Sequence, residues 1–466
     1  MPSDLQQRMF SELARKDIFE IARQSAYEYA DAALARRVFP APQDLAGLES
    51  FSEPLPPESG SGADIVQQLH RFGSPATVTS TGGRYFGFVT GGAIPAALGA
   101  RWLADFWDQN SALYKTSPVT SKLEKVCERW LRDIFGLPQQ TVAGFVSGTS
   151  TAILCGLAAG RYRLFQNRNW DINAKGFRGA PAMRVVTGRD AHGTVLKAIA
   201  VLGLGIDNIE WVDTDDQGRI VADRVPELDD STLLILQAGN VNSGSFDDFQ
   251  PLCARARSAG AWIHIDGAFG LWAAGCTQLA HLTRGIEGAD SWSVDGHKTL
   301  NTLYDSGVVL CRDQQALAAA LQASGSYIAY SENRDGMLYT PEMSRRARAV
   351  ELWASLKYLG RRGIDELVQG LYERAVQMSV ELRTADFSVL NDVVFNQVLV
   401  ACESDTITAR TIEHVQASGE CWVGGAKWRG RSVIRISVCS WATTEDDVSR
   451  SVRAFVHARA KARQPA

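Results

Sequence analysis

The sequence predicts an α/β protein with a mostly parallel central sheet, a small C-terminal α+β domain and an N-terminal helical arm. Short apolar segments alternate with helical segments between residues 90 and 315, which is typical of a parallel sheet covered on both faces. A helical segment with an apolar stripe precedes this region, and a long helical segment followed by strands comes after it. We expect the arm at 1–85, a large domain at 86–350 and the small domain at 351–466.

The arm is predicted to be helical over residues 4–37. Its apolar side chains recur at helical spacing, at Leu5, Met9, Phe10, Leu13, Phe19 and Ile21. The stretch SEPLPPESGSG at 52–62 is rich in Pro, Gly and Ser, which predicts a loop or linker. The apolar stripe can pack on the same chain or wrap a second subunit, and the sequence leaves both alternatives open.

The strands of the large domain are predicted from short apolar runs that end at turn residues. They lie at 145–146, 183–187, 233–237, 261–265, 291–294 and 308–311. Helical segments at 194–204 and 251–259 separate them. In the small domain we expect one or two helices over 344–382, strands at 386–400 and 432–440, and a closing helix at 444–462.

Composition excludes several classes of protein. Among the 466 residues, 45% are hydrophobic, and 52 acidic residues outnumber 48 basic ones. The net charge of −4 leaves no basic excess for neutralising phosphates, so we expect no nucleic-acid partner. The longest apolar run, at 198–206, is about half as long as a bilayer span, so we expect no membrane association. The opening MPSDLQQRMF does not resemble a signal peptide, and we expect a cytoplasmic location.

Cysteine and histidine patterns argue against metal chemistry. The eight cysteines are scattered without a CxxC pair, and we expect them to be reduced thiols. The seven histidines are also scattered, and no Cys/His group has the spacing of a zinc site. We therefore expect no metal.

Candidate catalytic residues follow the predicted strands, where ligands of parallel sheets bind. Asp266 ends one strand and is followed by two small residues, which allow a flat ligand to approach closely. His297 and Lys298 follow another strand side by side. His192 opens a helix, and the turn at 147–150 offers N–H groups to an anion at the start of the next helix.

Each of these features alone is typical of caps, turns or solvated charges, but together they match the needs of pyridoxal phosphate. The aldehyde needs a lysine amine. The pyridine nitrogen needs a buried carboxylate that keeps it protonated, so that the ring accepts electrons. The phosphate needs N–H and hydroxyl donors at a helix start.

The sequence resembles the group II pyridoxal-phosphate-dependent amino-acid decarboxylases over residues 80–455. The resemblance is carried by SGTSTAILCGLAAGR (147–161), DAHGTVLKA (190–198), WIHIDGAFG (262–270), ADSWSVDGHKTLN (289–301) and the tail RISVCSWATTEDDV (435–448). Members act on glutamate, aromatic amino acids, histidine or 2,4-diaminobutyrate. The resemblance implies the fold of the aspartate aminotransferase-like transferases (fold type I), with the cofactor in the large domain. It also implies a homodimer whose subunits close over the site.

The resemblance implies a role for each candidate residue. Lys298 would hold the cofactor as a Schiff base, Asp266 would bind the ring nitrogen, and His192 would stack on the ring near the substrate carboxylate. Ala268 would leave room at the opposite ring face.

The phosphate would be bound by Thr149 and Ser150, with His297 close by. Asn240 and Asn242 would line the cofactor pocket.

Three positions depart from the family pattern: Asp295, where many relatives have Asn or Ser, Thr299, where many have an aromatic residue, and Thr151, where Glu or Met is frequent. An ionised carboxylate cannot donate a hydrogen bond to phosphate. Asp295 therefore either points elsewhere or accepts hydrogen bonds from its neighbours.

The implied reaction is decarboxylation of an L-amino acid to the amine and CO2. Other pyridoxal phosphate chemistry on the same scaffold, such as that of an oxidative aldehyde synthase or a carbon–carbon lyase, remains the alternative. A tyrosine of the loop 326–341 would protonate Cα. Tyr330 is the candidate, and Tyr327 and Tyr339 are alternatives.

An aromatic wall would favour an aromatic or apolar substrate. It would be formed by Tyr85, Phe86, Phe88, Trp102 and Trp107. An arginine near the site, for which Arg84 and Arg101 are candidates, would instead indicate an acidic substrate.

Overall fold

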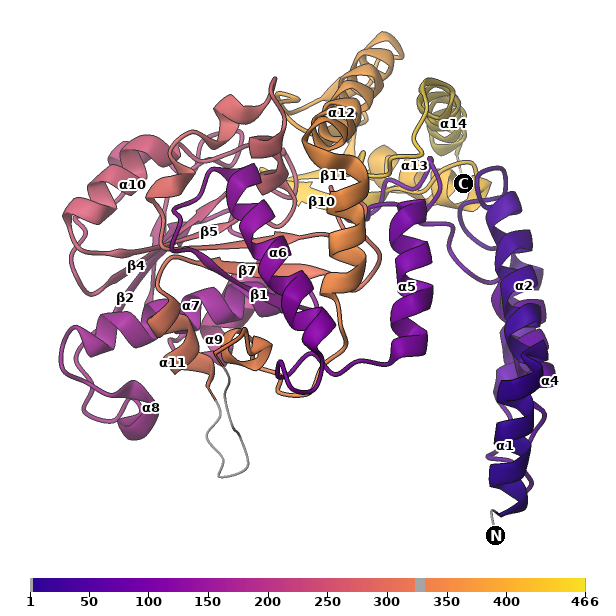
Figure 1. The fold of residues 1–466 in the computed structure, drawn as a ribbon. Coiled ribbons are helices and arrows are strands. Elements are labelled where there is room, and N and C mark those ends of the chain that lie inside the picture. Colours follow the sequence, from indigo (N-terminus) through magenta and orange to yellow (C-terminus); the bar gives the residue numbers. More distant parts are fainter. Residues whose placement is uncertain (1–2, 323–331, 466) are drawn as a thin grey trace.

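The computed structural model describes residues 3–322 and 332–465 and contains a seven-stranded sheet with helices on both faces (Figure 1). One strand is antiparallel to both of its neighbours and the other strand pairs are parallel, so the prediction of a mostly parallel α/β sheet is confirmed. In spatial order the strands are β1 (Val142–Val146), β7 (Gly307–Cys311), β6 (Ser291–Asp295), β5 (Trp262–Asp266), β4 (Thr232–Gln237), β2 (Arg184–Gly188) and β3 (Ile209–Val212).

Both faces of the sheet are buried because the strands are apolar at successive positions. In β4, Leu233 and Ile235 belong to one apolar cluster, whereas Leu234 and Leu236 belong to the cluster on the other face. Helices α7 (Thr149–Gln166), α9 (Gly193–Val201) and α11 (Gln314–Leu321) cover the first face, and the short α8 (Ile172–Lys175) lies beside α7. Helices α6 (Pro118–Phe135), α10 (Phe249–Ser258) and the first part of α12 (Ala349–Thr384) cover the second.

The C-terminal region forms a second, antiparallel sheet with its own helices. Its strands lie in the order β10 (Gly424–Trp428), β11 (Arg431–Ser437), β9 (Gln397–Ala401) and β8 (Ser388–Val389). Helices α13 (Asp405–Ser418) and α14 (Glu445–Ala462) complete this unit. The expected strand at 386–400 is two strands, and β10 and α13 were not predicted. The expected helical segment 344–382 is α12, which bends at Gly360 (φ 57°).

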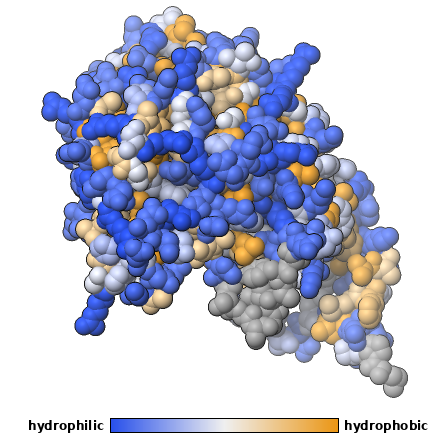
Figure 2. All heavy atoms as spheres, turned by 60° about the vertical axis from the view of Figure 1, so that its left-hand side comes forward, coloured by the Kyte–Doolittle hydropathy of each residue, from blue (hydrophilic) through white to orange (hydrophobic). Residues whose placement is uncertain are grey.

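The arm contains separate helices where one was expected over 4–37. Helix α1 (Asp4–Arg15) ends at Lys16, whose φ of 64° breaks the helical path before α2 (Asp17–Ala33) begins. The segment then continues through α3 (Pro42–Ala46) and α4 (Gly62–Gln68) to α5 (Pro95–Trp107). Figure 1 shows α1, α2 and α4 beside one another, extending away from the sheet. Figure 2 shows apolar surface on this arm at the lower right, beside a mostly hydrophilic body.

Short turns of other helix types connect these elements. They are the 3-10 segments Gly47–Phe51, Ile206–Asn208, Ala222–Arg224, Gly270–Gly275, Ala280–Thr283, Ile286–Gly288 and Gly336–Tyr339, and the π segment Leu69–Gly73. In the ranges that the structure describes, no helix combines the length and apolar character needed to span a membrane.

Candidate active site

A cavity of about 680 Å³ opens where the carboxyl ends of β4, β5 and β6 meet the first turns of α7 and α9. Its volume lies within the range of roughly 300–1,000 Å³ that is usual for ligand pockets. Seven of the predicted site residues line it: Thr149, Ser150, His192, Asp266, Ala268, His297 and Lys298. Gly239 and Val241 also contribute to the wall, whereas Asn240 and Asn242 do not lie among the lining residues.

Asp266 presents a buried carboxylate at the end of β5. It is 4% exposed, and its Oδ1 accepts hydrogen bonds from the N–H of Ala268 (3.2 Å) and the hydroxyl of Ser293 (3.3 Å). Burial raises the pKa of the Asp266 carboxyl, whereas the neighbouring His192 and Lys298 oppose this shift. This carboxylate would accept a hydrogen bond from a protonated ring nitrogen placed in the cavity, which is the partner that the pyridine nitrogen of pyridoxal phosphate requires.

Lys298 carries an amine that is paired with a carboxylate. Its Nζ lies 3.1 Å from Oδ2 of Asp295. Burial by itself lowers the pKa of Lys298, but the charges of Asp295 and Asp266 outweigh it, so the pKa lies above its ordinary value. The amine is therefore held as an ammonium ion.

Asp295 also binds the first residue of α7. The N–H of Thr149 donates to its Oδ1 at 2.7 Å, and the Thr149 hydroxyl donates to its Oδ2 at 2.6 Å. Of the two alternatives for this family departure, the second is therefore correct: Asp295 accepts hydrogen bonds from its neighbours. Both Thr149 donors that we expected to bind a phosphate are bonded to a carboxylate, which lies at a helix N-terminus where negative charge is favourable.

The other two departures serve packing and local hydrogen bonding. Thr299 is fully buried, and its hydroxyl donates to the carbonyl of Phe269 at 2.8 Å. The Thr151 hydroxyl lies 3.2 Å from that of Ser147, within the turn that begins α7.

His192 is fixed by the helix that it begins. Its Nδ1 accepts the N–H of Thr194 at 3.3 Å and lies 2.7 Å from the Thr194 hydroxyl, so Nε2 carries the proton of the neutral ring. Burial lowers the pKa of His192, while Asp266 opposes and Lys298 reinforces this shift. The burial thus favours the neutral form of the ring.

His297 is fixed between the strand β6 and an aromatic side chain. Its Nδ1 accepts the N–H of Ser306 at 3.1 Å, and its Nε2 lies 3.5 Å from Oδ2 of Asp295. Its ring stacks on Tyr304 with the centroids 4.1 Å apart and the planes at 25°. Burial lowers the pKa of His297, whereas Asp295 opposes this shift.

Residues 47–401 match the pyridoxal-dependent decarboxylase conserved domain. The chain belongs to the pyridoxal-dependent decarboxylase family. This confirms the resemblance inferred from the sequence. The enzyme is a carboxy-lyase whose cofactor is pyridoxal 5′-phosphate, and the buried Asp266, the Lys298 amine and the small Ala268 fit that group.

The relatives of this decarboxylase share its length as well as its fold. Tyrosine decarboxylase of Papaver somniferum is 25% identical over 433 residues, which cover 83% of this chain and 81% of the relative. Phenylacetaldehyde synthase of a Rosa hybrid cultivar is 24% identical over 371 residues, 72% of each chain. The crystal structure of Oryza sativa TDC with PLP and tryptamine superposes with a TM-score of 0.87 at 19% identity, over 97% of this chain and 98% of the other. The fold type I architecture is thereby confirmed.

Arg435 is a residue of the decarboxylase site that sequence reasoning missed. It lies on β11 of the small sheet and lines the cavity. Its Nε is buried and has no hydrogen-bond partner in the described part of the chain. Burial lowers the pKa of its guanidinium. Arg435 begins the RISV segment of the family tail, so the sequence contained a signal for it. The sequence does not show, however, that the strand carrying Arg435 lies beside the cavity.

The two arginines considered from the sequence lie elsewhere. Arg84 is buried and donates to the carbonyl of Glu420, and Arg101 pairs with Asp105 and Glu351. Neither lines the cavity.

Only one of the five expected aromatic residues, Phe88, lines the cavity of this chain, while Tyr304 at its mouth was not predicted. Tyr85 and Phe86 are buried in the core, and Trp102 and Trp107 are exposed on α5.

Of the three candidate loop tyrosines, the structure describes Tyr339. Tyr339 is buried, its hydroxyl accepts a hydrogen bond from Gln314 at 2.8 Å, and it does not line the cavity. Tyr327 and Tyr330 lie outside the described residues.

Among residues 3–322 and 332–465, no group of three His, Cys, Asp or Glu side chains is placed to hold a metal ion.

Proposed function

We propose that this enzyme decarboxylates an L-amino acid with an aromatic or apolar side chain, releasing the amine and CO2, and that Lys298 holds its cofactor. The observation that carries the proposal is the meeting of Lys298, Asp266 and Arg435 in one cavity. These supply an amine for the aldehyde, a carboxylate for the protonated ring nitrogen and a cation for the substrate carboxylate.

Bound pyridoxal phosphate draws electrons from the substrate Cα. Asp266 keeps a proton at the pyridine nitrogen, because its buried carboxylate gains most when it faces a positive charge. The neutral His192 covers one ring face and presents its Nε2–H. Ala268 leaves the other face free. Ser150 and His297, which line the same cavity, would bind the phosphate, whereas both donors of Thr149 are bonded to Asp295.

Arg435 binds the substrate through its α-carboxylate. Its guanidinium is free of acidic partners in the described ranges, whereas Lys298 is paired with Asp295. The same cavity is also lined by the apolar rings of Phe88 and Phe269, which suit an apolar side chain. A second candidate, an acidic amino acid, is favoured by the same arginine if it binds the side-chain carboxylate instead.

We further propose that the working enzyme is a homodimer. Apolar side chains of α1 are exposed, including Leu5, Met9, Phe10 and Leu13. The arm already packs on its own α5, where Phe19 meets Phe106 with centroids 5.0 Å apart, so the outer stripe is available to a second copy. Sedimentation of wild type and of Phe10→Ser/Leu13→Ser tests this, and an active wild-type monomer would contradict it.

We also propose a cytoplasmic location and a division of the chain into an arm (1–85), a large domain (86–350) and a small domain (351–466). All eight cysteines are unpaired and buried, which suits a reducing compartment such as the cytoplasm. The proposed change from the large to the small domain at residues 350 and 351 falls at the start of α12.

A product assay tests the reaction. The cofactor-loaded enzyme is incubated separately with aromatic, apolar and acidic L-amino acids, and amine, aldehyde and CO2 are measured by mass spectrometry. Amine with CO2 from an aromatic or apolar substrate is the expected result, and Lys298→Ala should give none. Aldehyde with oxygen consumption would replace the proposal with oxidative chemistry, and turnover of acidic substrates alone would establish the second candidate.

A further inference from the structure

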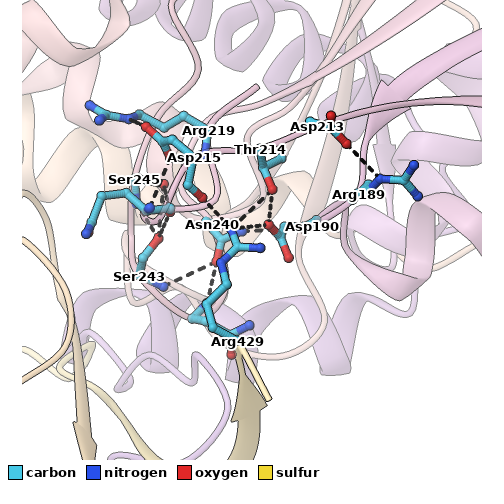
Figure 3. Close-up of polar contacts among 12 residues, drawn as sticks. Arg189, Asp190, Asp213, Thr214, Asp215, Arg219, Asn240, Ser243, Ser245 and Arg429 are labelled. Carbon is cyan, nitrogen blue, oxygen red and sulfur yellow. Dashed lines mark hydrogen bonds and ion pairs between the residues drawn. The ribbon is translucent and has the colours of Figure 1, made fainter. Parts of the chain in front are cut away.

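The segment that leads into His192 is held from both sheets of the molecule (Figure 3). Asp190 lies two residues before His192. Its Oδ2 accepts a hydrogen bond from Nη2 of Arg429 at 2.8 Å and another from the Thr214 hydroxyl. Its carbonyl accepts a hydrogen bond from Nδ2 of Asn240 at 3.3 Å. Both ends of Asp190 are therefore fixed before the chain reaches the histidine.

Arg429 comes from the small sheet, in the turn between β10 and β11. It adopts a φ of 47°, which is uncommon for a residue with a side chain. Its guanidinium lies over the ring of Trp428, 4.8 Å from the centroid. Besides Asp190, its Nη2 reaches the Thr214 hydroxyl (3.1 Å) and the carbonyl of Asp215. One side chain thus ties the small sheet to two loops of the large sheet.

The two loops that meet Asp190 are themselves braced. Asn240 accepts the N–H groups of Asn242 (2.8 Å) and Ser243 (3.2 Å) on its Oδ1, so its amide is oriented toward Asp190. The hydroxyls of Ser243 and Ser245 both donate to the carbonyl of Gln217 at 2.5 Å. Asn240 is fully buried behind the cavity wall. Its contacts therefore direct it to this bracing and not to the cofactor surface.

There is little room for the segment to move without moving His192. The N–H of Ala191 donates to the carbonyl of Gly188 at 3.1 Å, and His192 then caps α9. Behind His192 the free volume between Asp190, Gly218 and Asp266 is only about 10 Å³. A shift of Asp190 is therefore passed to the ring of His192.

We propose that Arg429 and Asp190 are positioning residues for His192, coupling the placement of the small sheet to the histidine that covers the cofactor ring. This inference rests on the proposed role of His192 in that site. The Asp190 and Arg429 side chains are 23% and 42% exposed, and ion pairs at such exposure add little stability. We therefore expect the Arg429–Asp190 pair, the clamp, to position the segment before His192, and its loss to leave the fold intact.

The test compares Arg429→Met with Arg429→Lys and with the control Arg431→Met. Arg431 is exposed at the other end of the same turn. All three polar contacts of Arg429 use Nη2, so a lysine ammonium can replace them. The first readout is the visible circular dichroism of bound pyridoxal phosphate, which reports its asymmetric surroundings without requiring turnover. The second is kcat and KM with the substrate found above.

We expect Arg429→Met to lower the dichroic signal by at least half and kcat by about tenfold, with the melting temperature and KM nearly unchanged. Arg429→Lys should retain most of the dichroic signal and most of kcat, and Arg431→Met should match wild type. Asp190→Ala, which removes the acceptor oxygens, should reproduce Arg429→Met, and the double variant should be no worse than either single variant. If Arg429→Met does not fold, Thr214→Val, which removes the bridging hydroxyl, should give a smaller change of the same kind.

An unchanged dichroic signal and kcat in folded Arg429→Met would overturn the proposal. If Arg429→Lys lost as much dichroic signal and kcat as Arg429→Met, the proposal would also be overturned, because a positively charged donor at the position of Nη2 would then not hold the segment. Failure of the decarboxylation proposal would appear differently, as a wild-type protein that binds the cofactor but forms no amine. The dichroic comparison would still test the clamp in that case.

Discussion

Replacing Asp295 with asparagine tests how the site controls the charge of Lys298. The substitution keeps the shape of the side chain and introduces the residue that many relatives carry. It removes the negative charge that lies 3.1 Å from the Lys298 Nζ. An asparagine oxygen can still accept the N–H of Thr149, so the start of α7 keeps its cap.

The size of the effect follows from the separation of the charges. With an effective dielectric constant of about 20, two unit charges 3.1 Å apart attract by about 5 kcal/mol. Burial of Asp295 and the remaining charge on Asp266 reduce the net change to about 1.5–3 kcal/mol, the usual value of a hydrogen bond between charged groups. This corresponds to about ten- to a hundredfold more neutral amine at a given pH.

The assay measures how fast Lys298 takes up pyridoxal phosphate, since only the neutral amine attacks the aldehyde. Incorporation into cofactor-free protein is followed by absorbance at pH 7, and borohydride reduction with peptide mass spectrometry confirms the site. Asp295→Asn should react about ten- to a hundredfold faster than wild type. Loss of a carboxylate beside the phosphate position acts in the same direction. The control is Asp207→Asn, which removes a charge from an exposed turn.

An Asp295→Asn rate equal to that of wild type, or slower, would refute this reasoning. It would mean that Asp266 alone sets the charge of Lys298, or that the carboxylate assists uptake. Rates measured from pH 6 to 9 separate these cases. The charge argument requires the rise in rate to move to lower pH in the variant. Asp266, His192, His297, Tyr304 and the amine itself remain as titrating groups that face the site.

Three further predictions concern substrate binding and stability. Arg435→Met should lower kcat/KM about ten- to a hundredfold for every amino acid substrate if the guanidinium binds the α-carboxylate; a loss confined to acidic substrates would contradict this. Burial lowers the pKa of His264 to about 3, so between pH 6.5 and 3 the unfolded chain binds a proton that the native state does not, and stability falls as the pH drops. In urea titrations from pH 6 to 4, His264→Gln should lose less stability than wild type, by about 1.4 kcal/mol per pH unit; parallel slopes would contradict this. Arg334→Met should cost about 3–5 kcal/mol of unfolding free energy, because it breaks two buried ion pairs, with Glu124 at 3.0 Å and with Glu128 at 2.6 Å, and leaves Glu124 with Arg345 alone. Arg362→Met on the exposed side of α12 should cost less than about 1 kcal/mol, and equal costs would show that burial does not matter here.

The sequence predicted six of the seven strands of the large sheet, all but β3, together with the residues at their ends. Apolar runs such as LLIL in β4 can be buried on both faces only in a covered parallel sheet, and this pattern is visible without a structure. Asp266 ends β5 and Lys298 lies three residues beyond the end of β6, so their meeting in one cavity follows from the rule that parallel strands end at one edge. Helix boundaries were less certain, because the break at Lys16 depends on a single backbone angle.

Only the tertiary structure decided which side chains face one another within that edge. Arg435 enters the cavity because β11 of a separate sheet is placed beside it, and local pattern carries no information on that placement. Asp295 turns to Thr149 because β6 lies near the start of α7, and Asn240 turns to Asp190 and not to the cofactor. Spacing along the chain sets the type of each element, whereas the partner of each polar group depends on contacts between segments that are far apart in the sequence.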